Sequence, residues 1–234
     1  MKKINEDQAM KLNRDEFRNY IQNYEPDEVF YRDLYFAEKE HPETFIEYCR
    51  NLDRDLITSH KLYVPALRKE AWFPYLEESE IFQDFNGNIM LSKHYRYSPV
   101  YIHEHEFFEI LCIYDGIAHT TIQGISHTLH TGDICIIPPH TRHSVEIFDD
   151  SIAINILVRS STFQTTFFQT LTADSALAQF FAHVLYHKTE GNFLIFHTGT
   201  DQIIMEALEN LFMEYLGHEK YSYTFLNSML VLFW

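Results

Sequence analysis

The sequence is short of basic side chains and of long apolar runs, and each shortage excludes a class of function. Its 234 residues contain 18 Lys and Arg against 34 Asp and Glu, a formal net charge of −16. Duplex DNA and anionic lipid surfaces are bound through patches of Lys and Arg, and no such patch is present. No run approaches the roughly 18 apolar residues that a membrane span needs. We therefore expect that this chain neither crosses a membrane nor binds duplex DNA by itself.

Cysteine is also scarce, which bears on the compartment. Cys49, Cys112 and Cys135 lie far apart, without a C-x-x-C spacing. This usage predicts buried thiols in a reducing cytoplasm. The first residues, MKKINEDQAM, have two lysines but no apolar stretch behind them, so they do not form a signal peptide. We expect a cytoplasmic protein.

Apolar and aromatic residues, in contrast, are plentiful. They include 20 Phe and 15 Tyr, and apolar residues make up 46% of the chain. This is enough to bury the core of one large domain, or of one domain with extensions. Most of the rings must be core, while some tyrosines are candidates to line a ligand cavity because Tyr combines a flat apolar face with a polar tip.

The hydrophobic period divides the chain into three regions. Residues 1–85 are predicted to be helical, because apolar residues recur at helical spacing in two stripes. Those of the first stripe are Phe17, Tyr20, Ile21 and Tyr24, and those of the second are Phe45, Ile46, Cys49, Leu52 and Leu56. Pro42 suits the first turn of the second helix. Residues 86–158 form short β-rich runs separated by turn signals such as Asp115-Gly116 and Gln123-Gly124, which predict an antiparallel sandwich or barrel.

The helical period returns in residues 159–234. Segments 161–171 and 174–186 are short amphipathic candidates, and 192–196 is a candidate strand. A longer helix is predicted to start after Thr200 or Asp201 and to stop at Gly217. Its apolar face packs either on the barrel or on a second chain. The apolar end, SMLVLFW, must likewise be covered by the rest of the chain or by a partner.

Four side chains in the strand region carry the candidate chemistry. His103, His105 and Glu109 have the same parity, so on one extended strand they would face the same side. His143 can join them if its strand lies alongside. Two or three imidazoles and a carboxylate suit a divalent metal such as Zn, Ni, Mn or Fe. The preferred interpretation is a metal-free polar lining that binds an organic effector, since buried Glu109 must be paired or solvated in either case.

Two further residues are candidates for contact with the effector. Arg142, in the loop after Pro138-Pro139, could clamp an anionic or hydroxyl-rich ligand. Tyr101 could stack on the face of a sugar. The alternatives are a solvated loop charge for Arg142 and core packing for Tyr101.

The same stretch resembles a known family. H-x-H-x3-E-x6-G, filled by His103, His105, Glu109 and Gly116, matches the first cupin motif. The second motif is similar in GDICIIPPHTRHSV, which contains His143, although His140 and Ile147 depart from the metal-binding form. The segments GDICIIPPHTRHSV and FFEILCIYDG resemble the sensor domains of AraC-type transcription regulators. The segment 192–233 resembles the helical tails of the same regulators.

The resemblance implies an α+β protein with a small cupin barrel (a double-stranded β-helix) flanked by helices. Residues 1–85 would be an N-terminal helical region, 86–158 the barrel sensor, and 159–234 a dimerisation and linker region. It implies a non-enzymatic homodimer that binds a small, sugar-like effector, with DNA bound only by a C-terminal helix-turn-helix domain that is not in this sequence.

Two alternatives stay open at this point. One is a metal-dependent cupin enzyme, of the dioxygenase or sugar isomerase type, in which His103, His105, Glu109 and His143 bind the metal. The other is a stand-alone dimer module without an effector.

Overall fold

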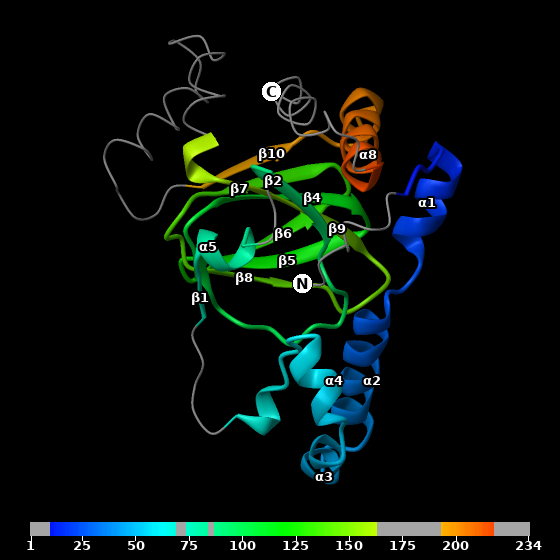
Figure 1. Ribbon diagram of the computed structural model, residues 1–234, viewed down its shortest axis with the longest axis vertical. Helices are drawn as coiled ribbons and strands as arrows, with labels where there is room; N and C mark the ends of the chain where they lie inside the picture. Colours follow the sequence, from blue (N-terminus) through cyan, green and yellow to red (C-terminus); the bar gives the residue numbers. More distant parts are fainter. Residues whose placement is uncertain (1–9, 69–73, 84–86, 163–192, 218–234) are drawn as a thin grey trace.

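The computed structural model describes residues 10–68, 74–83, 87–162 and 193–217, and within them it shows helices around two antiparallel sheets (Figure 1). This confirms the α+β class, with antiparallel sheets flanked by helices. The predicted helices at 161–171 and 174–186 lie almost wholly outside the described residues, and the apolar end at 228–234 lies outside them entirely. In the described ranges, no helix combines the length and the apolar character that membrane crossing requires.

The larger sheet has five strands, all paired antiparallel. Their order is β10 (Leu194–His197), β7 (Asp133–Ile137), β4 (Phe108–Asp115), β9 (Ile152–Val158) and β2 (Ile89–Lys93). The central strands are buried along almost their whole length, as expected for near-continuous runs of Ile, Leu and Val that are covered on both faces. β10 confirms the predicted strand near 192–196 and extends the sheet beyond residue 158.

The smaller sheet has three strands, in the order β6 (Ile125–His130), β5 (Ile117–Ile122) and β8 (His143–Glu146). A two-residue turn, Gln123-Gly124, joins β5 to β6 with φ values of 53° and 81°. Both residues are left-handed, as hairpin turns that follow the twist of the strands require. A short parallel pair, β1 (Tyr75–Leu76) with β3 (Glu104–His105), lies beside the sheets.

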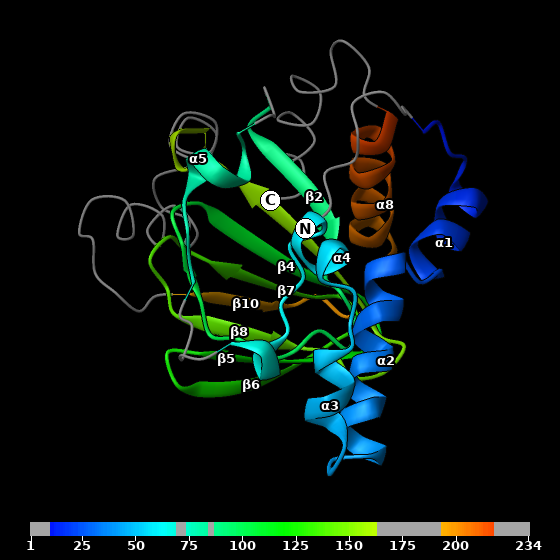
Figure 2. The same cartoon turned by 60° about the horizontal axis from the view of Figure 1, so that its bottom comes forward.

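The two sheets face each other as separate layers (Figure 2). Apolar side chains from both fill the space between them, including Leu111 and Ile113 from β4, Ala118 and Ile122 from β5, and Ile137 from β7. Because neighbouring residues of a strand point to opposite faces, odd-numbered residues of β4 face this inner space and even-numbered residues face outward.

Two helices from opposite ends of the chain cover the outer face of the larger sheet: α1 (Arg14–Gln22) and α8 (Gln202–Gly217) (Figure 1). Asp201 caps α8 by accepting a hydrogen bond from the Ile203 amide at 2.8 Å, as predicted. The apolar face of α8 packs within the chain, burying Leu208, Leu211, Phe212, Tyr215 and Leu216. Glu209, buried on the same helix, binds Arg18 of α1 at 2.9 Å.

The rest of the N-terminal region is helical but more broken than predicted. It contains α2 (Pro26–Glu40), α3 (Phe45–Arg50), α4 (Arg54–Ser59), a 3-10 turn η1 (Pro65–Leu67) and α5 (Glu78–Ile81). The prediction of one helix through Pro42 and Leu56 is wrong. The Asp53 side chain accepts hydrogen bonds from the Asp55 and Leu56 amides and so starts a new helix, while Ile46, expected to be buried, is 48% exposed.

A buried ionic group attaches α2 to the larger sheet. Glu28 contacts Lys93 Nζ at 2.6 Å and Arg96 Nε at 2.8 Å, and all three side chains are at most 2% exposed. Burial alone would raise the pKa of Glu28, but the hydrogen bonds from Arg96 and Lys93 outweigh it and hold that pKa below its ordinary value. The carboxylate is therefore charged at neutral pH and balances two buried cations.

Candidate functional site

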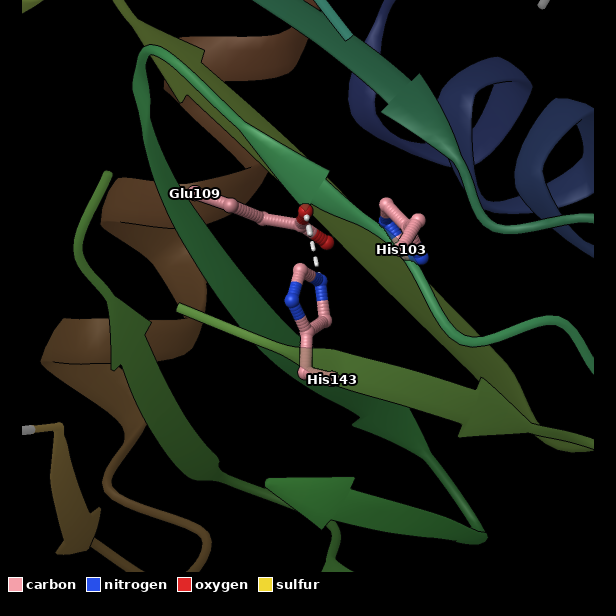
Figure 3. A group of neighbouring side chains, drawn as sticks. All are labelled: His103, Glu109 and His143. Carbon is pink, nitrogen blue, oxygen red and sulfur yellow. Dashed lines mark ion pairs between the residues drawn. The ribbon is translucent and has the colours of Figure 1, made fainter. Parts of the chain in front are cut away.

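β4 carries Glu109 into the inner space, where the carboxylate is only 4% exposed. Its Oε2 lies 3.3 Å from His105 Nε2 and 3.4 Å from His143 Nε2. Figure 3 shows Glu109 and His143 pointing toward each other, with His103 beside them. A carboxylate in an otherwise apolar layer is costly unless it is paired, and the imidazoles supply that pairing.

The predicted residues converge, but not for the predicted reason. His103, His105 and Glu109 do not share one strand, because β3 ends at His105 and the chain bends at 106–107 before β4 begins. His103 is instead held against His143 by a pair of backbone hydrogen bonds of 2.9 and 3.0 Å. Because the bend contains two residues, side chains before and after it keep the same alternation between the two faces of the sheet. Glu109 therefore still faces the histidines.

Three of the four side chains form a compact donor set. His103, Glu109 and His143 each offer one ligand atom, and these atoms lie within 4.8 Å of one another. His105 is not a member of that set, and its ring stacks on Phe107 at a centroid distance of 4.4 Å. A carbonyl 2.9 Å from His143 Nδ1, that of Thr141, orients the His143 ring so that Nε2 points toward Glu109. Two imidazoles and a carboxylate, all buried, suit a divalent cation of the Zn, Ni, Mn or Fe type.

Burial and the neighbouring groups set the protonation states. Burial, aided by repulsion from His143, holds the pKa of His103 well below its ordinary value, and burial also lowers the pKa of His105. Burial would raise the pKa of Glu109, but the contacts with His105 and His143 prevail and hold it well below the usual range. At neutral pH the site therefore presents a carboxylate next to the uncharged rings of His103 and His105.

Not all of the polar atoms here are aligned for hydrogen bonding. His143 Nε2 and both ring nitrogens of His105 are buried and have no well-oriented hydrogen-bond partner among the described residues. The distances to Glu109 are short enough for attraction, but the angles are poor. Buried polar atoms in native proteins are nearly always satisfied, so atoms like these indicate a place for a ligand, an ion or ordered water.

The two remaining candidates, Tyr101 and Arg142, lie in different places relative to Glu109. Tyr101 adjoins the cluster, with its ring centroid 4.9 Å from that of His103, and burial raises its pKa. Arg142 does not adjoin it. Since His143 points inward, Arg142 points outward, where it is exposed and lines a surface hollow of about 800 Å³ with Glu104 and His140. A ligand held by Glu109 is therefore on the other side of the strand from Arg142.

Three inner residues were missed by the sequence reasoning: Ser92, His94 and Asn155. The signal that could have found them is a polar side chain inside an apolar strand, as in IAINILV around Asn155. Recognising that they belong together requires the pairing of β2 with β9, which the sequence alone does not reveal.

Comparison with known proteins gives a family match. Residues 90–223, more than half of the chain, match the family described as the AraC-like ligand binding domain. A segment of 58 residues is 34% identical to the HTH-type transcriptional activator RhaS of Yersinia pestis and of Yersinia pseudotuberculosis. That segment is 25% of this chain and 21% of RhaS, so the match spans about a fifth of the relatives' length.

Solved structures are similar over part of the chain. ToxT from Vibrio cholerae, in a ligand-free variant form, is 16% identical, with a TM-score of 0.47 over 63% of this chain and 55% of that one. KdgF from Halomonas sp. is 23% identical, with a TM-score of 0.29 over 31% of this chain and 71% of that one.

Proposed function

Because this chain belongs to the family of AraC-like ligand binding domains, we propose that it is the sensor region of a transcription regulator and binds a small effector next to Glu109. The observation that supports this most is the buried carboxylate. An ionised group in an apolar layer lowers stability unless it is fully satisfied, and here the surrounding nitrogens are poorly aligned. A ligand that hydrogen-bonds to Glu109 and the imidazoles would satisfy these buried polar atoms.

The fold offers a route from this site to the helical flank. β4 carries Glu109 near one end and Tyr114 near the other, on its outward side, where the Tyr114 hydroxyl donates a 2.8 Å hydrogen bond to Glu209 of α8. A ligand that binds one arrangement of β4 more tightly than another would bias α8 by the difference in binding free energy. We propose that the regulatory output of the domain lies at this outer helix.

The remaining parts of the proposal concern partners. The relatives are named helix-turn-helix activators, and the net charge of −16 makes direct contact with DNA by this chain unfavourable. DNA binding therefore belongs to a separate helix-turn-helix domain, and the sensor acts as a homodimer without catalytic activity. Two-fold dimers are the commonest assembly among soluble homo-oligomers.

A bound divalent metal is the second candidate, favoured by the donor atoms within 4.8 Å of one another. His103, Glu109 and His143 would hold it, and it would supply a positive charge that polarises an oxygen of the effector. Such a metal is compatible with the regulator and would also be needed by a cupin enzyme. Elemental analysis of protein purified without chelator or nickel resin separates the metal-bound from the metal-free site.

The proposal is tested by effector screening with a site variant and a matched control. Thermal shift against a metabolite library should give ligands that stabilise the protein, and Glu109→Gln should lose that stabilisation. The control is Thr120→Val, because the Thr120 hydroxyl is also buried but already donates to the Ser144 carbonyl at 2.8 Å. If the Glu109 variant responds to every ligand as the parent does, the effector does not bind here. Turnover of a ligand would instead support the enzyme.

A further inference from the structure

A second group of donor atoms surrounds Asp133, away from the effector site. Asp133 begins β7, whereas Glu109 lies opposite Ile137 at the other end of that strand. At about 3.3 Å per residue, Asp133 is roughly 13 Å along β7 from the inner donor set. The Asp133 side chain is 5% exposed, and one histidine from each of the two sheets approaches its carboxylate.

The two histidines approach different oxygens of this carboxylate. His197 of β10 is the direct cross-strand partner of Asp133, and its Nδ1 lies 3.0 Å from Asp133 Oδ1. His130, the last residue of β6, places its Nδ1 3.9 Å from Asp133 Oδ2. The His197 and His130 side chains are 72% and 64% exposed, so an ion from solution can reach both rings.

Hydrogen bonds hold the carboxylate in place before any ion binds. The His130 amide donates to Asp133 Oδ2 at 2.9 Å, and the Gly132 amide donates to the Ile113 carbonyl at 2.8 Å. The Thr198 hydroxyl donates to the Gly132 carbonyl at 2.6 Å, which holds the end of β10 against the turn before β7. A site fixed in this way loses little conformational freedom when it binds a ligand.

The spacing of the donor atoms is close to that of a zinc site. With bonds of about 2.0–2.1 Å, two ligands of one tetrahedral zinc ion lie about 3.3 Å apart. The two distances from the carboxylate, 3.0 and 3.9 Å, lie on either side of this value. Unlike the inner set, the three donors do not all lie within 4.8 Å of one another, so binding requires the His130 ring to turn inward. An exposed side chain changes rotamer readily.

We propose that His130, Asp133 and His197 bind a zinc-type divalent ion at a site separate from the effector site. Imidazole and carboxylate ligands suit such an ion, and three protein ligands leave a fourth position for water. Because His130 belongs to the smaller sheet and the other two residues to the larger sheet, the ion links the two layers and ties β10 to β7. It therefore stabilises the folded domain, the state in which the three ligands meet.

The first experiment is calorimetric titration of the full chain with zinc chloride. His197→Gln should remove one bound zinc ion per chain or weaken its binding about tenfold or more, and His130→Gln should act in the same direction. His119→Gln is the matched control, because His119 is also exposed on the smaller sheet but contacts the Thr128 hydroxyl instead of a carboxylate. It should change the affinity less than about twofold. The zinc ion should still bind to Glu109→Gln, which lacks the inner carboxylate.

The second experiment measures stability in the Glu109→Gln background. Zinc at 100 times its dissociation constant should raise the melting temperature by about 5–11 °C, and adding His130→Gln and His197→Gln should abolish this shift. Unchanged zinc binding in the His130→Gln, His197→Gln double variant would overturn the proposal, as would an equal loss in His119→Gln. Loss of all zinc binding in Glu109→Gln that is folded by circular dichroism would also overturn it, by assigning the ion to the inner set.

Discussion

Removal of Glu28 should strongly destabilise the protein, because it would leave two cations buried. In the structure, Glu28 is the carboxylate that both Lys93 and Arg96 contact, and neither cation is more than 2% exposed. Breaking a buried ion pair by deleting one partner costs about 3–5 kcal/mol. Lys93 also donates to the Asn23 carbonyl at 2.6 Å, and this remaining contact limits the loss. We therefore expect Glu28→Ala to lower the free energy of unfolding by about 3–4 kcal/mol.

The assay is urea denaturation followed by circular dichroism, supported by a thermal melt. For a protein of this size, 1 kcal/mol corresponds to about 2–4 °C, so the melting temperature should fall by about 6–16 °C. Glu47→Gln is the matched control, since Glu47 is exposed and should change stability by less than about 0.5 kcal/mol. A loss below about 1 kcal/mol in Glu28→Ala would refute the reasoning, because the two cations would then be adequately solvated without the carboxylate.

Three further results are expected. Stability contributed by Glu28 should be present above the ordinary carboxylate pKa and be lost as the pH falls through its lowered folded-state pKa, so acid titration should destabilise the parent more than Glu28→Gln. Gly132→Ala should fail to fold stably, judged by soluble yield and circular dichroism, since φ is +87° and the added Cβ would overlap the Gly199 carbonyl oxygen. Asp201→Ala should lose about 1 kcal/mol in denaturant melts by removing the cap of α8, and no loss would show that the cap is dispensable.

Local patterns predicted much of this fold. The change in the spacing of apolar residues and the glycine-containing turns located the strands between two helical regions. Both signals could be read because they depend only on residues close in sequence. The Asp201 cap and the Gln123-Gly124 hairpin are of this kind. The break at Asp53 was missed because the apolar stripe continues across it, although the capping carboxylate was visible in the sequence.

Part of the candidate site was predictable because it, too, depends on the spacing of residues close in sequence. The spacing of His103, His105 and Glu109 indicated one face, and the alternation survived the bend between β3 and β4. The inward placement of Asn155 opposite Ser92 depends on which strands pair and in which register, and that pairing is set by the whole fold. The outward direction of Arg142 was equally hidden, because a position in a loop does not reveal which side of the next strand its side chain will take.

The position of β10 limits how the domain can be shortened. β10 pairs with β7 from Leu194↔Ile136 to His197↔Asp133, joining segments that are far apart in the chain. A fragment ending at residue 158 would leave β7 as an exposed strand of otherwise buried residues, DICII. Bare apolar edges of this kind recruit other strands and aggregate. The smallest piece of this domain that stays in solution should therefore extend past His197, and its folding must wait for synthesis of that distant strand.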